Sequence, residues 1–267
     1  MIIFSERING MYRDVRQAIN EKNKQIVQDL VRTQVAGGAD VIDINLGPTK
    51  GDPVENFVWL AGAVSEVTDK PLSLDSAKPH LLVQVVPKVR ALQPQTRLVI
   101  NSSTAAAESM AKLIPLAAAH GAGIIGLTMD QEGVPGNVEK RVECGATFLM
   151  AALEAGIAPQ DVYLDPIMMP LKHMQDQAKE ILKAASQFQL FSDPPCHVVC
   201  GLSNVSIGTT HKKLINRVFT AMLVANGLDA IILDVLDEDL VNTILAAELI
   251  MNRFIFADSF VEAFRQP

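Results

Sequence analysis

Eight short aliphatic runs recur along this chain, and longer amphipathic stretches separate them. Runs of Val, Ile and Leu bounded by turns are typical of strands that are buried on both faces. The expected strands are Ile2–Ser5, Val41–Asn45, Leu72–Asp75, Leu98–Asn101, Gly123–Thr128, Val162–Asp165, Val198–Gly201 and Ala230–Asp234. The expected helices between them are Lys24–Ala36, Glu55–Thr68, Pro79–Leu92, Ala105–His120, Val138–Ala155, Lys172–Phe191, Leu214–Asn226 and Asp239–Asn252.

Strands that alternate with helices over 267 residues predict an α/β fold, a closed (β/α)8 or TIM barrel that forms a single domain over residues 1–267. Gly121, Gly156 and Gly227 fall just past helical runs, where a residue with positive φ ends a helix at little cost. An open doubly wound sheet is the alternative, but no G-x-G-x-x-G motif follows the first strand. A short helix at Arg13–Asn20 and a tail at Phe256–Phe264 are expected as additions to the barrel.

The composition narrows the class of protein. Apolar residues make up 49% of the chain, charged residues 20%, and the net charge is −7. These values argue against disorder and against a surface that binds nucleic acid. No apolar stretch approaches the roughly 20 residues that cross a bilayer, and the start MIIFSERING lacks the basic region of a secretory signal.

The three cysteines are Cys144, Cys196 and Cys200. They are too few for a disulfide framework and fit a reducing cytoplasm. Cys196 and Cys200 form a C-x3-C pattern, but no neighbouring His or Cys completes a tetrahedral set, so core thiols are favoured over a metal site. We therefore expect no metal.

Polar side chains follow four of the expected strands: Asp75, Asn101, Asp165 and Asn204. In a barrel of this kind the loops after the strands build the active site, so these side chains should gather at one end. Taken singly, Asp75, Asn101 and Asn204 could equally cap helices or turns. Caps alone do not require carboxamide-type groups to collect at one end, so together the four favour a ligand site.

Other polar residues near the strand ends can be explained by structural roles. Asp43 and Asp234 are expected to be structural and to bond barrel backbone or loop amides. Glu6 and Arg7 could pair with each other across the mouth of the barrel. The set as a whole is rich in Asp and Asn, poor in His and without a lysine at a strand end.

This set suits a flat, amide-like heterocycle better than a phosphate or a nucleophilic triad. A carboxylate accepts two parallel N–H bonds, which a 2-amino-4-oxopyrimidine supplies from its ring N3–H and its exocyclic amine. Asp165 or Asp75 could bind that edge. Asn carries a donor and an acceptor, so Asn101 and Asn204 could satisfy ring nitrogens whose protonation changes during a reaction.

Several motifs resemble one known family, the tetrahydrofolate:corrinoid-protein methyltransferases, a pterin-binding (β/α)8 group. The resemblance covers essentially the whole chain in order, and SERING combined with GLSNVS is highly specific, whereas GADVIDIN is shared with dihydropteroate synthase. The motifs are SERING, GGADVIDINLGP, LSLDS, VINSS, GIIGLTMD, YLDPI, GLSNVS, LINR and DSF at Asp258–Phe260.

The resemblance implies methyl transfer between N5 of tetrahydrofolate, as substrate, and the cobalt of a corrinoid (cobalamin) on a partner protein. By motif it implies that Asp75, Asn101 and Asp165 hold the pterin, that Gly201 and Ser203 line it, and that Asn204 hydrogen-bonds near N5 as the catalytic member. It places Glu6 and Asn9, with Met129, in the same polar network or facing the corrinoid. Relatives form homodimers, and no residue fixes the direction of transfer.

Two other functions compete with this one. Dihydropteroate synthase holds a pterin diphosphate and needs basic residues after the seventh strand, where this chain has Ser203-Asn204-Val205. A folate-binding barrel without turnover is the second alternative, because fold alone does not prove activity. The loop Ile207–Lys213 departs from the amide-rich stretch of relatives and is expected to face the partner.

Overall fold

Eight parallel strands form one sheet at the centre of the protein, whose computed structural model describes residues 1–253. The strand order is β7-β6-β5-β4-β3-β2-β1-β8, so each strand lies beside its neighbour in sequence and β8 returns to β1. The strands are β1 (Ile2–Asn9), β2 (Val41–Asn45), β3 (Leu72–Asp75), β4 (Leu98–Thr104), β5 (Gly123–Leu127), β6 (Val162–Asp165), β7 (His197–Val198) and β8 (Ala230–Leu233).

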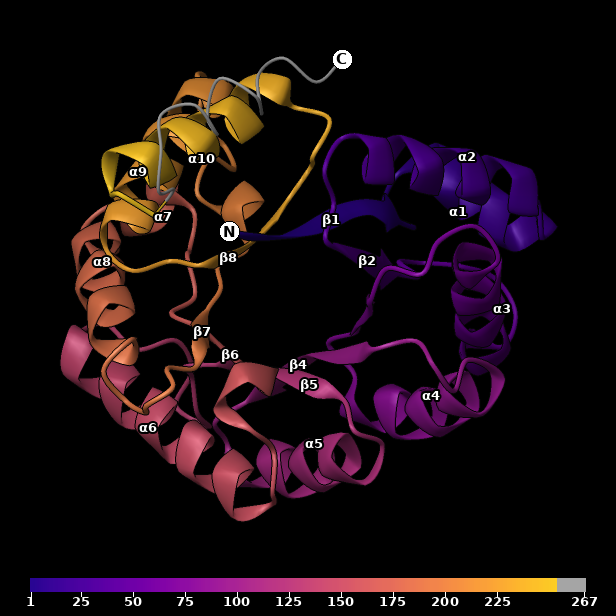
Figure 1. Ribbon diagram of the computed structural model, residues 1–267, viewed down its shortest axis with the longest axis horizontal. Helices are drawn as coiled ribbons and strands as arrows, with labels where there is room; N and C mark the ends of the chain where they lie inside the picture. Colours follow the sequence, from indigo (N-terminus) through magenta and orange to yellow (C-terminus); the bar gives the residue numbers. More distant parts are fainter. Residues whose placement is uncertain (254–267) are drawn as a thin grey trace.

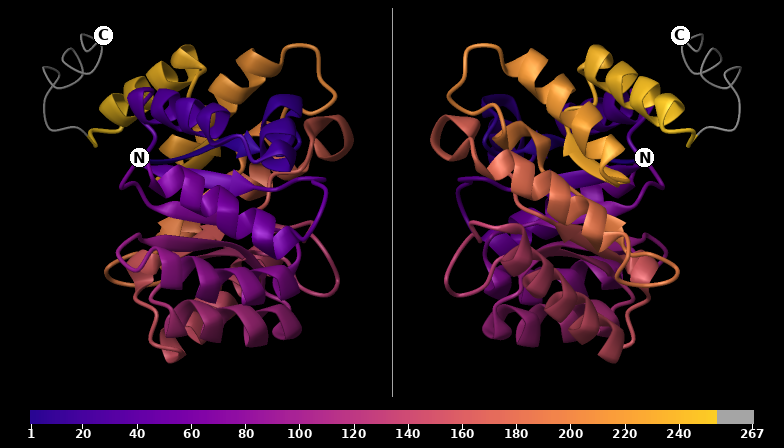
Figure 2. Two further views of the ribbon diagram at one scale, coloured as in Figure 1. Left: turned by 90° about the vertical axis from the view of Figure 1, so that its right-hand side faces the viewer. Right: turned by 90° about the vertical axis from the view of Figure 1, so that its left-hand side faces the viewer.

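The helices surround this sheet as an outer layer (Figure 1). Two side views from opposite directions show the same layer of helices (Figure 2). They are α1 (Arg13–Glu21), α2 (Lys24–Ala36), α3 (Pro53–Ser65), α4 (Pro79–Leu92), α5 (Ala107–Ala119), α6 (Val138–Glu154), α7 (Leu171–Met174), α8 (Gln177–Phe188), α9 (Lys212–Ala225) and α10 (Glu238–Ile250), with short 3-10 turns η1 (Pro159–Asp161) and η2 (Leu202–Asn204). The predicted (β/α)8 barrel is therefore confirmed. No helix within the described part of the chain has the length and apolar character needed to span a bilayer.

The barrel closes between β7 and β8 without a regular ladder. The Ile232 N–H donates to the Cys200 carbonyl at 3.0 Å, and Gly201 forms an isolated parallel bridge with Ile232. The predicted strand Val198–Gly201 was thus wrong in its bounds. After Val198 the extended backbone bonds first to β6, through Val199 N–H and the Leu164 carbonyl at 2.9 Å, and then to β8.

Side chains that point into the barrel form an apolar floor below a polar layer. The floor is the separate buried cluster Phe4, Val41, Val99, Ile125, Tyr163, Val199 and Ala230. Phe4 and Tyr163 meet there edge to face with ring centroids 5.3 Å apart. Because side chains alternate along a strand, the residue two positions after a floor residue also points inward, and this is where Asp43, Asn101 and Asp165 lie.

The larger core lies between the sheet and the helices. Ile42 and Ile44 on β2, and Leu72 and Leu74 on β3, alternate with the inward-pointing residues and pack outward into it. The predicted strands VIDIN and LSLD are therefore apolar on the helix side and polar on the barrel side near their carboxyl ends. Burial on both faces explains why these strands read as nearly continuous hydrophobic runs.

Two strands run longer than predicted because each contains a register shift. The β1 pairing with β2 is irregular between Ser5 and Ile8, and the β4 pairing with β5 is irregular between Ile100 and Ser103. Bulges of this kind redirect side chains and are over-represented beside active sites. Here they contain Glu6 and Asn101.

The predicted helix Lys172–Phe191 is divided into α7 and α8. The N–H of Leu171 donates to the Val205 carbonyl at 3.1 Å, which ties α7 to the loop after β7, whereas α8 packs on the sheet. The expected tail Phe256–Phe264 and the DSF motif at Asp258–Phe260 lie outside the described residues. The short helix expected at Arg13–Asn20 is confirmed as α1.

Candidate active site at the carboxyl ends of the strands

Side chains at the ends of β2, β3 and β4 bond to one another. The Asn45 Nδ2 atom donates to Asp75 Oδ2 at 2.7 Å, while Asn45 Oδ1 accepts the Gly47 N–H at 2.7 Å. The Asn101 Nδ2 atom donates to Asp43 Oδ1 at 3.1 Å. We call Asp43, Asn45, Asp75 and Asn101 the amide–carboxylate cluster. Asp75 and Asn101 therefore lie in it as the sequence predicted, and neither caps a helix.

Asp43 was expected to bond backbone or loop amides, and this was wrong. Its carboxylate is buried at the polar level of the barrel and accepts the Asn101 carboxamide instead. Burial and the nearby Asp75 carboxylate raise the pKa of Asp43 well above its ordinary value. Burial also raises the pKa of Asp75, and the Asn45 hydrogen bond offsets part of that rise. Both carboxyl groups therefore hold a proton more readily than an exposed Asp.

Asp165 ends β6 and is held by backbone. Its Oδ1 accepts the Ile167 N–H at 2.7 Å. Burial raises the pKa of Asp165 to about 6, and the N–H groups of Ile167 and Gly201 act in the opposite direction. Ile167 has φ +61°, a left-handed conformation that a β-branched residue rarely adopts. Backbone strain of this kind is enriched at functional sites.

Arg141 on α6 fixes the same turn from behind, and the sequence reasoning missed it. It is fully buried, and its Nε donates to the Pro166 carbonyl at 2.9 Å. Its other nitrogens donate to the Asn137 carbonyl at 3.2 Å and to the Gln177 side chain. The guanidinium thus holds the peptide group between Pro166 and Ile167. No local motif marks this role.

Glu6 lies in the β1 bulge and accepts a hydrogen bond from the Ser203 hydroxyl. Burial is the main cause that raises the pKa of Glu6, while the Ser203 bond lowers it and the charges of Asp234 and Asp75 raise it further. The expected Glu6–Arg7 pair does not form. Arg7 instead pairs with Asp14 at 2.5 Å.

Asn204 lies in η2, exposed on the rim, and within residues 1–253 no partner holds its carboxamide by a hydrogen bond. A Cβ placed on Gly201 would lie 3.4 Å from Asn204 Nδ2. The carboxamide therefore extends over Gly201, beside the backbone that closes the barrel. Asn204 caps no α-helix, so the alternative that it serves as a helix cap does not apply.

The remaining predicted residues divide into two groups. Asn9 Oδ1 accepts the Met11 N–H at 2.9 Å, and Asp234 Oδ1 accepts the Leu236 N–H at 3.1 Å, so both stabilise turns, as expected for Asp234. Met129 is half-buried, and its carbonyl accepts the Ala105 N–H at 2.8 Å. The parts of Asn9 and Met129 in a catalytic network remain predictions.

Within residues 1–253, no group of three or more His, Cys, Asp or Glu side chains is arranged to hold a metal ion. Cys196 and Cys200 are buried and free. Burial raises the pKa of Cys196 to about 12 and that of Cys200 well above its ordinary value. Both behave as core thiols.

The inward carboxylates and carboxamides thus gather at the carboxyl ends of the strands. Residues 13–234 match the model of the family described as pterin binding enzyme. The chain belongs to this family. The match spans β2 to β8, the strands that carry the amide–carboxylate cluster and Asp165.

Relatives in the family agree with the motif-based resemblance. A methylcorrinoid:tetrahydrofolate methyltransferase of Eubacterium limosum is 28% identical over 270 residues, which cover 100% of this chain and 97% of the relative. Methionine synthase of Mycobacterium leprae is 25% identical over 245 residues, 87% of this chain, and the match spans 20% of that longer protein. The resemblance to tetrahydrofolate:corrinoid-protein methyltransferases is thus confirmed.

Solved structures of similar shape include dihydropteroate synthases. That of Yersinia pestis with a sulfonamide drug complex has a TM-score of 0.69 at 15% identity and covers 95% of this chain and 94% of its own. That of Coxiella burnetii with pteroic acid has a TM-score of 0.68 at 13% identity and covers 93% and 92%. At these identities the likeness establishes the barrel fold alone.

Proposed function

We propose that this enzyme transfers a methyl group between the cobalt of a corrinoid carried on a separate protein and N5 of tetrahydrofolate. The observation that carries the proposal is the ring of inward acceptors formed by Asp75, Asn101 and Asp165 above an apolar floor. The full-length similarity to a methylcorrinoid:tetrahydrofolate methyltransferase supports both the substrate and the partner. It also favours transfer toward tetrahydrofolate.

The pterin edge matches these groups chemically. Its N3–H and 2-amino group donate in parallel, and a carboxylate accepts such a pair with charge-assisted bonds. Asp75 and Asp165 lie at the polar level with raised pKa values, because burial has removed water that would stabilise their charge. A bound pterin replaces that water with fixed donors. In the proposal, Asn101 supplies a donor and an acceptor to the ring between them.

The β7 end of the mouth does not suit a diphosphate. Ser203 and Asn204 follow β7 with no basic residue beside them in sequence, and Lys213, which lines a pocket with Ser203, lies 3.8 Å from Asp237. Arg7 is engaged with Asp14 and stacks 4.3 Å from the Tyr12 ring centroid. A diphosphate leaving group needs cations or several N–H donors. Dihydropteroate synthase chemistry therefore fits this chain less well than methyl transfer, even though the folds agree.

Asn204 is the proposed catalytic residue, and Gly201 and Ser203 line the pterin beside it. In transfer toward tetrahydrofolate, N5 attacks the methyl carbon, the carbon–cobalt bond breaks with its electron pair left on cobalt, and the N5 proton departs to solvent. The Asn204 carboxamide has no partner within the described chain, so its oxygen is available to hold the N5–H as positive charge develops. In the reverse direction, proton density at N5 improves it as a leaving group.

The partner is proposed to dock over the loop after η2. Ile207 is half exposed there, and its N–H donates to the Asn204 carbonyl at 3.3 Å, which connects the docking loop to the catalytic residue. A homodimer and a cytoplasmic location also belong to the proposal. The exposed apolar side chains Val218 and Met222 on α9 support the homodimer, and the free cysteines support a reducing compartment.

The decisive experiment is a spectrophotometric assay with methylcobalamin or a methylated corrinoid protein. Loss of the methyl-Co(III) spectrum should require both the enzyme and tetrahydrofolate, and mass spectrometry should find 5-methyltetrahydrofolate in matching amount. Tetrahydrofolate binding without turnover in either direction would instead favour a folate-binding barrel. Turnover of a pterin diphosphate with p-aminobenzoate would favour the synthase.

A further inference from the structure

Arg141 on α6 is a buried cation whose hydrogen bonds all go to neutral acceptors. Its side chain is fully buried. One acceptor is the Pro166 carbonyl after β6, at 2.9 Å, and a second is the Asn137 carbonyl before α6, at 3.2 Å. The third is the side-chain oxygen of Gln177, the first residue of α8. The guanidinium therefore joins three segments of the chain, and no carboxylate within residues 1–253 bonds to it.

Stability alone does not account for a charge in this position. A guanidinium that leaves water loses hydration, which neutral acceptors replace only in part. Burial lowers the pKa of Arg141, and the charge of Glu180 offsets part of that effect while its carboxylate bonds Lys183 at 2.9 Å. An apolar side chain could fill the same space without the loss of hydration. It could not hold three acceptors at fixed angles, as the planar guanidinium does.

The bond from Arg141 to Pro166 acts on Asp165 through one peptide group. The Pro166 carbonyl and the Ile167 N–H belong to the same planar trans peptide and point in opposite directions. Arg141 holds the carbonyl on one side, and the N–H donates to Asp165 Oδ1 at 2.7 Å on the other. Ile167 has φ +61°, and a strained conformation of this kind persists only where surrounding contacts hold it. Fixing the carbonyl therefore fixes the N–H against the carboxylate.

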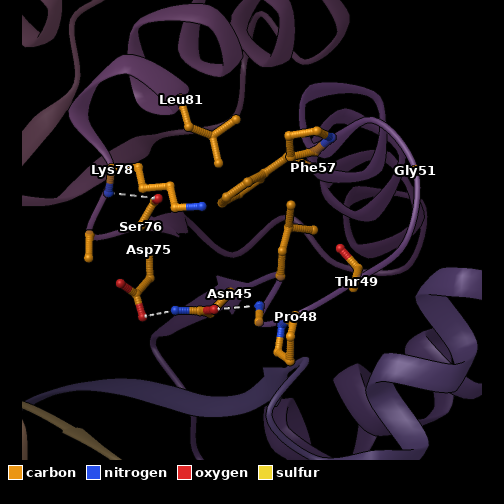
Figure 3. Close-up of a pocket in the computed structure, with 13 residues that line it drawn as sticks. Asn45, Pro48, Thr49, Gly51, Phe57, Asp75, Ser76, Lys78 and Leu81 are labelled. Carbon is orange, nitrogen blue, oxygen red and sulfur yellow. Dashed lines mark hydrogen bonds between the residues drawn. The ribbon is translucent and has the colours of Figure 1, made fainter.

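The two carboxylates proposed to bind the pterin are held in different ways. Asp75 accepts the side-chain amide of Asn45 at 2.7 Å (Figure 3). Asp165 accepts only backbone N–H groups among the residues 1–253, those of Ile167 and Gly201. The orientation of Asp165 thus depends on the turn after β6, and the turn depends on what holds it from behind.

We propose that Arg141 is a positioning residue for Asp165, acting through the Pro166–Ile167 peptide to fix the plane of the carboxylate that accepts the pterin N–H groups. The inference rests on the proposed function, because the pterin contact makes that plane matter. A carboxylate accepts two parallel N–H bonds only when both oxygens face the donors. A cation on the carbonyl also polarises the N–H, since hydrogen bonds in series strengthen one another. The affinity for folate is therefore set partly from α6, outside the ring of strand ends.

The first test examines the turn without a ligand. Hydrogen exchange of the Ile167 amide should be about ten-fold faster in Arg141→Lys than in wild type, because an ammonium does not replace the planar fork. Phe148→Leu is the matched control, since Phe148 is fully buried on the same helix and its ring packs on Gly126 of β5. It should lower the free energy of unfolding and leave the Ile167 exchange unchanged. An unchanged exchange rate in Arg141→Lys would overturn the proposal.

The second test is a double-mutant cycle on the Kd for tetrahydrofolate, measured by calorimetry. Arg141→Lys should raise this Kd about ten-fold in the wild-type background and less than about two-fold beside Asp165→Asn, whose carboxamide no longer accepts both N–H groups. A general loss of structure would instead add its full effect in both backgrounds. Equal losses in the two backgrounds, or no loss in the wild-type background, would overturn the positioning role.

Gln177→Ala keeps the cycle available if Arg141→Lys does not fold. It removes one acceptor from the guanidinium and leaves the charge, so it should raise the Kd about three-fold, and again only where Asp165 is present. Wild-type protein that binds no tetrahydrofolate would contradict the pterin site, and with it the role of Arg141 in affinity. Wild-type binding with no effect of either variant would overturn the positioning role and leave the proposed function standing.

Discussion

On the β2–β4 side of the barrel mouth, inward polar side chains hold one another, whereas on the β7 side the Asn204 carboxamide has no hydrogen-bond partner within residues 1–253. Asn45 bonds Asp75, and Asn101 bonds Asp43, across neighbouring strands. Asn204 on the opposite side is exposed and extends over Gly201. The first side is preorganised to bind, and the second keeps a carboxamide free to follow a reacting atom.

The difference teaches how one site can be rigid and adaptable at once. Side chains that hydrogen-bond one another lose little further entropy when a ligand arrives, so they supply affinity and orientation. A group that stabilises charge only in the transition state must stay uncommitted in the ground state, and its contribution belongs to kcat. Substitutions on the two sides should therefore change different kinetic constants.

Asn204→Ala should give the largest effect. Loss of the carboxamide should lower kcat about 100-fold, the lower end of the range for proton-handling groups, while the Kd for tetrahydrofolate changes less than about three-fold. Single-turnover spectroscopy and calorimetry measure the two quantities. Asn226→Ala on the far end of α9 is the control. Comparable losses in kcat and affinity would show that Asn204 is a binding residue. The two sides of the barrel mouth would then not differ in role.

Asp75→Asn should give the converse result. The substitution keeps the size of the side chain but removes the charge that accepts two parallel N–H bonds, so the Kd for tetrahydrofolate should rise about 30-fold. At saturating tetrahydrofolate, kcat should stay within about three-fold of wild type. A fall in kcat with unchanged affinity would place Asp75 with Asn204 and contradict a division of the mouth into two sides.

Asp165→Asn should stabilise the protein while it weakens binding. The pKa of Asp165 is raised to about 6, against about 3.9 in an unfolded chain. The folded state therefore holds the proton more tightly, and stability falls as pH rises from about 4 to about 6. The free energy of unfolding of the variant should exceed that of wild type by about 3 kcal/mol at pH 8 and match it near pH 4.

Denaturant unfolding at the two pH values checks this prediction, and tetrahydrofolate affinity of the wild type should fall as pH drops below about 6, because the protonated acid accepts one bond fewer. Asp161→Asn serves as the control, since Asp161 precedes the same strand on the surface and pairs with Arg97. A variant less stable than wild type at pH 8 would show that the Ile167 N–H contact outweighs the cost of burying the charge.

Ile207→Asp should give the smallest effect and separates the partner from the reaction. The KM for a methylated corrinoid protein should rise about five-fold, in keeping with a rim position in an interface. Turnover of free methylcobalamin should be unchanged, because it needs no docking surface. Equal losses with both methyl donors would move Ile207 from the partner surface into the site beside Asn204.

The sequence predicted strands best where each strand pairs regularly along its whole length. The bounds expected for Val41–Asn45, Leu72–Asp75 and Val162–Asp165 are those observed, because polar side chains and turns mark their ends. β1 and β4 continue past their expected ends because bulges let the backbone keep pairing through polar residues. β7 is shorter than expected because its backbone divides its hydrogen bonds between two neighbouring strands.

The site was predictable at single strand ends and not across elements. Asp75, Asn101 and Asp165 each stand at a visible boundary between apolar run and loop. The partner of Asp43 is 58 residues away, so no local pattern distinguished a backbone contact from a side-chain contact.

The apolar floor formed by Phe4, Tyr163 and their neighbours has a consequence for the sequence of events in catalysis. A closed floor leaves the mouth as the route by which folate, its proton and the methyl group all pass. A corrinoid protein docked over Ile207 would cover that route. We therefore expect compulsory-order kinetics in which tetrahydrofolate enters first, the methyl donor second, and the methylated folate departs only after the donor has left.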